Sequence, residues 1–193
     1  TKALGLLHKQ ICKDSSMCRQ GLPDYLVTMR KPGENHELIA HPEGFESYIG
    51  EDEPEGAKIE RPQPDAEKYE KKEKYNEVPV YSHQVWRKYA SPVWMDIRQS
   101  NTLNGKSARE EQDERHICPL QLDVIARGIN LWTNENDIVL DPFAGIGSSN
   151  YVALKMGRRT IGVELKENYY NLALENVEKA DMDYIIEGIT NEF

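Results

Sequence analysis

The spacing of apolar and polar residues is most regular in the last third of the chain. Apolar residues at helical spacing predict one helix whose first residue is Pro119, and a second helix over residues 167–180. The apolar run at 138–140 predicts a short buried strand, residues 160–163 predict another strand, and a helix is expected between them at 151–156. This order predicts an α/β protein that contains part of a doubly wound parallel sheet. The predicted helix faces consist of Leu120, Val124, Ile125, Ile129 and Trp132 in the first helix, and Tyr169, Leu172, Ala173, Asn176, Val177 and Ala180 in the last.

The first half of the chain carries weaker patterns. Residues 4–11 have apolar side chains at helical spacing, and residues 25–30 predict a strand that Pro32 and Gly33 end. From Glu34 to about residue 77 the chain is rich in Glu, Pro and Gly and has few apolar residues. This composition predicts an irregular insertion or a mobile loop.

Length and charge limit the class of protein. The 193 residues suit one catalytic-type domain, and no apolar run approaches the roughly 20 residues of a membrane-spanning helix. We therefore expect a soluble protein without a membrane partner, and we expect it to be cytoplasmic because its three cysteines are interpreted as reduced thiols. The net charge of -9 argues against a nucleic-acid partner, but residues 34–83 hold fourteen acidic and six basic residues, so the acid is concentrated in the middle. The three cysteines match no zinc pattern, so we expect reduced thiols and no metal.

A glycine-rich turn joins the first predicted strand to its helix. It reads Asp141-Pro142-Phe143-Ala144-Gly145-Ile146-Gly147-Ser148, and such a turn lets a ligand approach the backbone at a helix N-terminus. Glu164 follows the next predicted strand, where an acid can accept hydrogen bonds from both hydroxyls of a ribose. Together, the turn and Glu164 predict a site for an adenosine-containing ligand.

Three residues favour S-adenosylmethionine over a dinucleotide. Asn150 stands where the dinucleotide fingerprint has its third glycine. Asp141 could hold the cationic amino group of a methionine moiety, and Phe143 could provide an apolar wall near a sulfonium. The alternative is structural: Phe143 belongs to the core and Asp141 only caps the turn.

Four segments resemble those of the permuted class of DNA amino-methyltransferases, with the phage-borne branch closest. They are Val93–Ile97, His116–Gln121, Asp141–Ser149 and Gly162–Glu164. The resemblance implies a partial, C-terminal part of the Rossmann-like S-adenosylmethionine-dependent methyltransferase fold, with S-adenosylmethionine as cofactor. The implied cofactor-binding residues are His116, Pro119, Asp141, Pro142, Phe143, Gly145, Gly147, Ser148 and Glu164.

The same resemblance divides the chain into three regions. Residues 1–31 would supply a helix and a late sheet strand of the catalytic half, residues 32–88 an irregular acidic target-recognition region, and residues 89–193 the cofactor-binding half. Because the chain opens on Thr1 and not on Met, we expect it to be the C-terminal part of a longer enzyme, with the missing N-terminal part as its partner.

The catalytic motif of the family is not found in the chain. That motif is Asp/Ser/Asn-Pro-Pro followed by an aromatic residue, and in the family order it would precede Thr1. Ser91-Pro92-Val93-Trp94 is an alternative, but it departs from the motif at Val93 and lies only 22 residues before His116. We therefore leave the catalytic residues unassigned and expect Trp94 to be buried.

The resemblance implies site-specific methylation of double-stranded DNA, as in restriction–modification systems. The expected reaction moves a methyl group from S-adenosylmethionine to the N6 amine of adenine. The alternatives are methylation of cytosine at N4, methylation of RNA or protein, and a noncatalytic module that binds cofactor or DNA.

Overall fold

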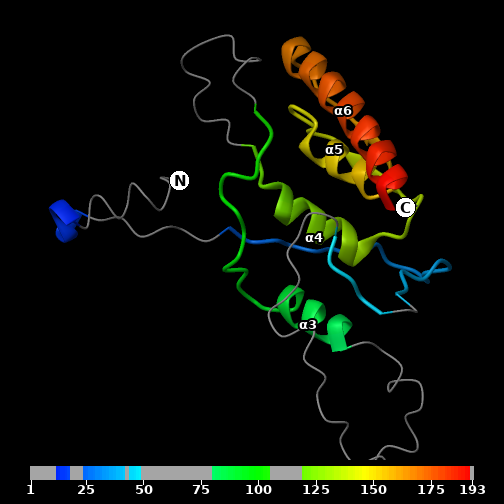
Figure 1. The fold of residues 1–193 in the computed structure, drawn as a ribbon, viewed down its shortest axis with the longest axis horizontal. Coiled ribbons are helices and arrows are strands. Elements are labelled where there is room, and N and C mark those ends of the chain that lie inside the picture. The colour runs from blue at the N-terminus through cyan, green and yellow to red at the C-terminus, as the bar shows by residue number, and fades with distance from the viewer. Residues whose placement is uncertain (1–11, 18–23, 42–43, 49–79, 105–118, 192–193) are drawn as a thin grey trace, which may run out of the picture. The chain divides into compact units, whose positions relative to one another are not determined.

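The computed structural model describes residues 12–17, 24–41, 44–48, 80–104 and 119–191, with side chains described from residue 82 in the helix that begins at Val80 and as far as residue 180 in the last helix. The chain divides into two units after Leu38. The second unit contains the helices α3 (Val80–Tyr89), α4 (Leu122–Trp132), α5 (Ser148–Lys155) and α6 (Glu167–Asn191), and the strands β1 (Ile138–Asp141) and β2 (Arg159–Gly162) (Figure 1). No helix in the described ranges is long and apolar enough to cross a membrane.

The first unit contains the short 3-10 helix η1 (Ser15–Met17). Asp14 Oδ1 accepts hydrogen bonds from the backbone N–H and the hydroxyl of Ser16, which fixes its first turn. The predicted strand at residues 25–30 is wrong: this segment forms no strand, and the side chains of Tyr25 and Met29 are exposed. A strand needs a neighbour for its backbone groups, and the described residues supply none here. The predicted helix at residues 4–11 lies outside the described residues.

The second unit is built around a parallel β-α-β unit, which confirms the α/β prediction. Strand β1 pairs with β2 in register from Ile138 opposite Arg159 to Asp141 opposite Gly162, and α5 makes the crossover. Both strands lie within two residues of their predicted bounds, because short apolar runs between turn residues mark them clearly. This arrangement is part of a Rossmann-like sheet.

Helices α4 and α5 pack together through a small apolar core. Ile125, Ala126 and Ile129 of α4 meet Val152 and Ala153 of α5 there. Helix α4 begins at Leu122 with Gln121 as its N-cap, so the prediction that Pro119 is its first residue is wrong. Of its predicted face, Leu120 and Trp132 are exposed, whereas the central residues are buried or partly buried.

Helix α6 lies beside α5 (Figure 1) and extends eleven residues beyond its predicted end at Ala180. Its predicted face is confirmed, because Tyr169, Asn176 and Ala180 are buried and the other three residues of that face are partly buried.

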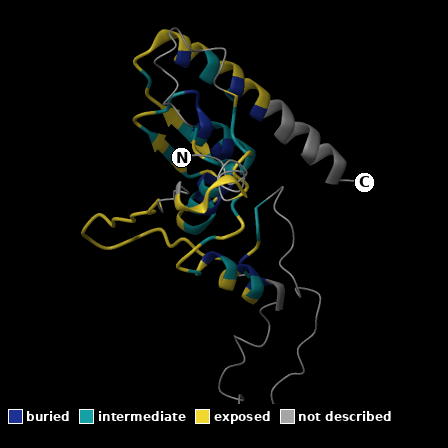
Figure 2. Cartoon of the chain, turned by 90° about the vertical axis from the view of Figure 1, so that its left-hand side faces the viewer, coloured by how far each residue is buried: buried dark blue, intermediate teal, exposed yellow. Residues whose placement is uncertain are grey.

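One face of the two-stranded sheet is exposed. Side chains alternate between the faces of a strand, and in β1 and β2 those of Ile138, Leu140 and Ile161 are exposed. Figure 2 shows the strands largely in the colour of exposed residues. The other face carries Val139, which packs against the α4–α5 core. The prediction of a buried β1 is therefore wrong for one of its two faces.

Residues 44–48 and α3 form a second small core. Phe45 is 7% exposed, packs with Val85 and Tyr89, and donates its backbone N–H to Ser82 Oγ at 2.6 Å. Residues 44–48 form neither helix nor strand, which confirms irregular structure there, and their packing on α3 favours the irregular insertion over the mobile loop. The prediction of irregular structure as far as residue 88 is wrong, because α3 begins at Val80. The three proposed regions of the chain remain predictions.

Candidate functional site

The glycine-rich turn between β1 and α5, residues 142–147, is called the glycine loop below. Gly145 and Gly147 have φ angles of +54° and +79°, which lie in the left-handed region that residues with a side chain rarely adopt. Gly147 is also the N-cap of α5 and contributes no side-chain cap. The two glycines let the chain turn sharply from the end of β1 into α5.

Glycine also permits close packing around this turn. A Cβ atom on Gly147 would lie 3.1 Å from Cβ of Ala173 in α6, so the glycine lets α5 and α6 approach each other. A Cβ atom on Gly162 would lie 2.8 Å from Oδ1 of Asn150. The Asn150 amide, which donates to Thr160 Oγ1, therefore fills the space beside the end of β2.

Hydrogen bonds join the glycine loop to the chain that follows β2. The Val163 N–H donates to Asp141 O, and the Ala144 N–H donates to Val163 O, both at 2.9 Å. The Glu164 carboxylate accepts three backbone N–H groups: that of Gly145 at 2.8 Å on Oε2, and those of the next two residues along the chain at 2.9 Å on Oε1. Glu164 is therefore fixed at the edge of the loop.

Ile146 anchors the glycine loop to α6. Its carbonyl accepts a hydrogen bond from Asn176 Nδ2 at 2.8 Å, and its side chain is buried against Tyr169. Leu103 and Leu172 pack against the same cluster. Three segments that are distant in sequence therefore meet at the loop.

The acid and the aromatic residue of the glycine-rich turn have different roles. Asp141 Oδ1 accepts the Phe143 N–H at 3.0 Å, so Asp141 caps the turn, as the structural alternative expects. Phe143 is 89% exposed, so the other half of that alternative, a core role for Phe143, is wrong. Leu165, directly after Glu164, is 97% exposed. The sequence analysis did not identify Leu165 as a candidate site residue, although its position directly after an acid at the end of a strand could have indicated one.

The structure brings together most of the predicted site residues. The loop, its two ends and the segment after β2 hold Asp141, Pro142, Phe143, Gly145, Gly147, Ser148 and Glu164. Pro119 is half-buried ahead of α4 and takes no part in the hydrogen bonds of the loop described above. His116 lies outside the described residues. Within the described ranges, no three His, Cys, Asp or Glu side chains form a group that could hold a metal ion.

The alternative catalytic segment forms a local turn. Ser91 Oγ donates to Val93 O at 2.8 Å, and Trp94 Nε1 donates to Tyr89 O at 3.0 Å. The guanidinium of Arg127 lies 5.0 Å from the Tyr89 ring and 5.1 Å from the Trp94 ring. Trp94 is partly buried and Val93 is exposed. These contacts give Ser91 and Trp94 structural roles.

A parallel β-α-β unit with a glycine-rich turn after its first strand and an acid after its second is the arrangement found in Rossmann-like folds. A family model described as DNA methylase, of the N6/N4 type, matches residues 22–175. The chain therefore belongs to the N6/N4 DNA methylase family.

Individual relatives match shorter stretches. The chain is 40% identical over 76 residues to the type II methyltransferase M1.MboII of Moraxella bovis, covering 39% of this chain and 28% of that protein. It is 33% identical over 90 residues to M.HindIII of Haemophilus influenzae, covering 46% of this chain and 29% of that protein. The matched stretch is thus less than a third of the length of either relative.

A solved structure is also similar in sequence. A Thermus thermophilus protein, described as a DNA modification methylase and solved in complex with S-adenosyl-L-methionine, is 31% identical to the chain. The match has a TM-score of 0.32 and covers 40% of this chain and 36% of that one.

Proposed function

We propose that the glycine loop and Glu164 bind S-adenosylmethionine, and that the protein transfers its methyl group to the N6 amine of adenine in double-stranded DNA. Membership of the N6/N4 DNA methylase family supports this reaction. The observation that carries the cofactor assignment is the Glu164 carboxylate, held by the Gly145 N–H at the ends of two parallel strands. A DNA substrate in a bacterial cell would place the protein in the cytoplasm.

The residues at the loop fit the chemistry of this cofactor. A carboxylate has about four acceptor positions, and backbone groups fill three on Glu164, which leaves one for a single ribose hydroxyl and not for the two that the sequence analysis expects. Apart from Gly145 itself and its two neighbours in the chain, no described residue has an atom within 4 Å of the Cβ position of Gly145, so a ligand can approach the backbone there. The exposed side chains of Phe143 and Leu165 offer apolar contacts to the rest of a nucleoside.

The bound cofactor would supply an electrophilic methyl group on a sulfonium. The chain would position it: Glu164 would orient the ribose, the second carboxylate oxygen of Asp141 would face the amino group of the methionine moiety, and Phe143 would exclude water. The chemistry supplied in this way would be a direct methyl transfer, in which the target amine would gain the methyl group and lose a proton and the cofactor would leave as its thioether. This route needs no cysteine nucleophile. We expect the amine-binding motif of the family to lie outside these 193 residues.

Substitution of Glu164 tests the cofactor assignment. In the complete enzyme Glu164→Ala should weaken cofactor binding by at least about tenfold, because hydrogen bonds to a charged group contribute about 1.5–3 kcal/mol each. Glu164→Gln should lose less, because one acceptor oxygen stays. Glu167→Ala, an exposed acid at the start of α6, is the matched control. Calorimetry of each folded variant measures the effect. Unchanged cofactor binding in folded Glu164→Ala would remove the ribose assignment.

Two measurements distinguish the alternative functions: which base is methylated, and how substitution of Ser91 changes methyl transfer. Tritiated methyl incorporation into duplexes with adenine or cytosine as the only available target distinguishes N6 from N4 methylation. A noncatalytic module would transfer no methyl group, and the turn that engages the Ser91 hydroxyl favours that outcome for the 193 residues alone. Robust incorporation by this chain, abolished in Ser91→Ala, would instead make Ser91–Trp94 the catalytic motif.

A further inference from the structure

Two ion pairs join residues 96–103, which precede α4 in the sequence, to that helix. Asp96 Oδ2 lies 2.6 Å from Nη2 of Arg127, and Arg98 Nη2 lies 2.6 Å from Oδ1 of Asp123. In the segment the acid precedes the base, and in α4 the acid also precedes the base, so the two stretches pair in opposite directions. A parallel arrangement would place Asp96 opposite Asp123 and Arg98 opposite Arg127. The order of the charges therefore favours an antiparallel alignment of residues 96–103 with α4.

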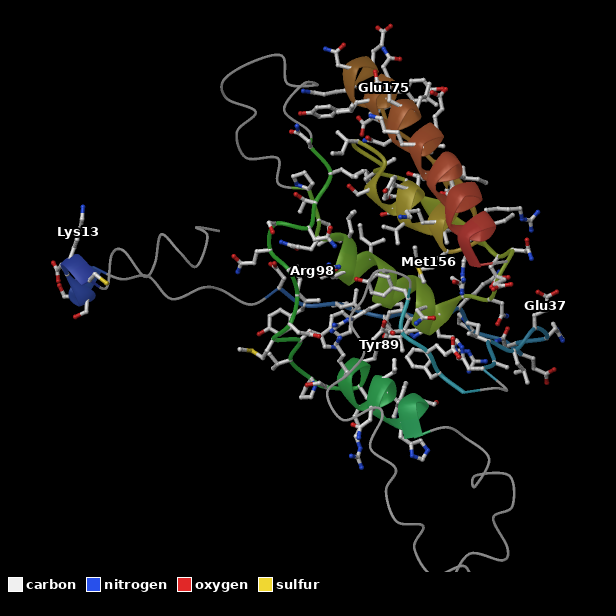
Figure 3. The ribbon with its side chains drawn as sticks, viewed as in Figure 1. Lys13, Glu37, Tyr89, Arg98, Met156 and Glu175 are labelled. Carbon is white, nitrogen blue, oxygen red and sulfur yellow. The ribbon has the colours of Figure 1, made fainter. Side chains whose placement is uncertain are left out.

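The spacing specifies one register as well. Asp96 and Arg98 are two residues apart, which spans at most about 7 Å of chain. Asp123 and Arg127 are four residues apart on a helix, a rise of about 6 Å. The two spans match, so both pairs form at once when the segment is aligned as observed. Arg98 lies beside the first turns of α4 (Figure 3).

Asp123 is the centre of this attachment and is 3% exposed. Besides the Arg98 guanidinium, it accepts the Arg98 backbone N–H and Nδ2 of Asn101, both at 2.8 Å. The Tyr48 hydroxyl donates to the same carboxylate at 2.6 Å. The Leu122 N–H donates to Asn101 O at 2.8 Å, so the segment is also tied to the first residue of α4 by its backbone.

The end of the attached segment packs against a cluster that contains a residue of the glycine loop. Leu103 follows Asn101 by two residues and packs on the buried cluster of Ile146 and Tyr169. Ile146 belongs to the glycine loop, and its carbonyl is held by Asn176. Because Asn101 is bound to Asp123, the attachment limits where Leu103 can lie. Leu103 therefore connects Asp123 with the loop.

We propose that Asp123 and Arg98 are positioning residues for the glycine loop: by fixing the register of residues 96–103 on α4, they hold Leu103 against the cluster of Ile146 and Tyr169 and keep the loop in its ligand-binding shape. The inference rests on the proposed cofactor role of the loop. Neither residue is assigned a contact with the cofactor, so both act through Leu103.

Amide hydrogen exchange of the 193-residue chain tests the proposal without any cofactor. The N–H groups of Ala144, Gly145 and Gly147 are hydrogen-bonded at the loop and report on its opening. In Asp123→Asn we expect these amides to exchange at least about tenfold faster, because charged hydrogen bonds are lost. Leu103→Ala should accelerate the same amides while the ion pairs remain. Arg98→Lys should restore part of the protection that Arg98→Ala removes.

Arg158→Ala is the matched control. Arg158 donates to the hydroxyl and carbonyl of Thr133, near the amino ends of the strands, so its loss should lower stability without selectively opening the loop. Equal acceleration of the loop amides in Arg158→Ala, or none in Leu103→Ala, would overturn the proposal. If Asp123→Asn does not fold, the half-exposed Arg98 variants give the same test. Calorimetry with S-adenosylmethionine tests the proposed function separately. If the loop opens in the variants as expected but neither the unsubstituted protein nor any variant binds the cofactor, the result contradicts the proposed function and leaves this inference standing.

Discussion

At the scale of single residues, the glycines of the loop have different structural requirements. Gly145 needs only its positive φ, since a Cβ there meets open space, whereas Gly147 also lies against Ala173. Asn150 shows why such details escape sequence reasoning. In the sequence it stands out only as a missing glycine, but its amide fills the space that Gly162 leaves free. The loop and its acid are predictable from the sequence, whereas the backbone partners of Glu164 depend on a turn geometry that no residue pattern specifies.

The two loop glycines give a matched pair of substitutions. Gly145→Ala should cost about 1 kcal/mol for the left-handed backbone alone. Gly147→Ala should cost about 2–4 kcal/mol, because the methyl group also crowds Ala173. Urea unfolding of both variants measures the difference. Equal losses would show that α6 moves freely away from α5.

Acid should weaken the attachment of residues 96–103. Burial opposes ionisation of Asp123, but hydrogen bonds from Arg98, Tyr48 and Asn101 outweigh it and hold the pKa of Asp123 well below its usual range. A carboxyl whose pKa is lower in the folded state contributes stability above its unfolded pKa of about 4, and this contribution is lost as the pH falls further. The free energy of unfolding should therefore fall below about pH 5, and less steeply in Asp123→Asn. Identical pH profiles for the two proteins would contradict this assignment.

At the scale of elements, the spacing of apolar residues predicts the helices and strands that nearby residues stabilise. It misses a helix whose packing depends on residues distant in the sequence. Helix α6 and the two strands have regular apolar patterns and begin at or next to their predicted positions. Helix α3 escapes prediction because its buried apolar face is small, Val85 and Tyr89, and is completed by Phe45 from far along the chain. Residues 25–30 have a strand pattern, but a pattern alone supplies no partner.

The contact of Phe45 with α3 should be a main source of stability for that helix. Phe45→Ala should cost about 3–5 kcal/mol, the usual loss for truncating a buried Phe. Tyr25→Ala, at an exposed aromatic residue, should change stability by no more than about 0.5 kcal/mol. Thermal or urea unfolding compares them. A small loss in Phe45→Ala would mean that α3 does not depend on residues 44–48.

At the scale of the whole molecule, the sheet has one bare face within the described residues. Parallel sheets are normally covered on both faces, yet Leu140 and Ile161 are exposed. Leu140→Lys should therefore change the free energy of unfolding of this chain by no more than about 0.5 kcal/mol. Val139→Lys, on the covered face, should cost about 2 kcal/mol or more, because it puts a charge against the α4–α5 core. Urea unfolding compares the two variants, and a comparable loss in Leu140→Lys would show that this face is covered in solution.

The short crossover also bears on the order of folding. Paired positions in β1 and β2, such as Val139 and Thr160, are only 21 residues apart, and α5 lies between them. The entropy of loop closure and the distance in sequence between contacts govern how fast a small domain folds. The hydrogen bond from Phe45 to Ser82 spans 37 residues and so closes a longer loop. We therefore expect the strands and α5 to form the more local nucleus, and the glycine loop to take shape early in folding.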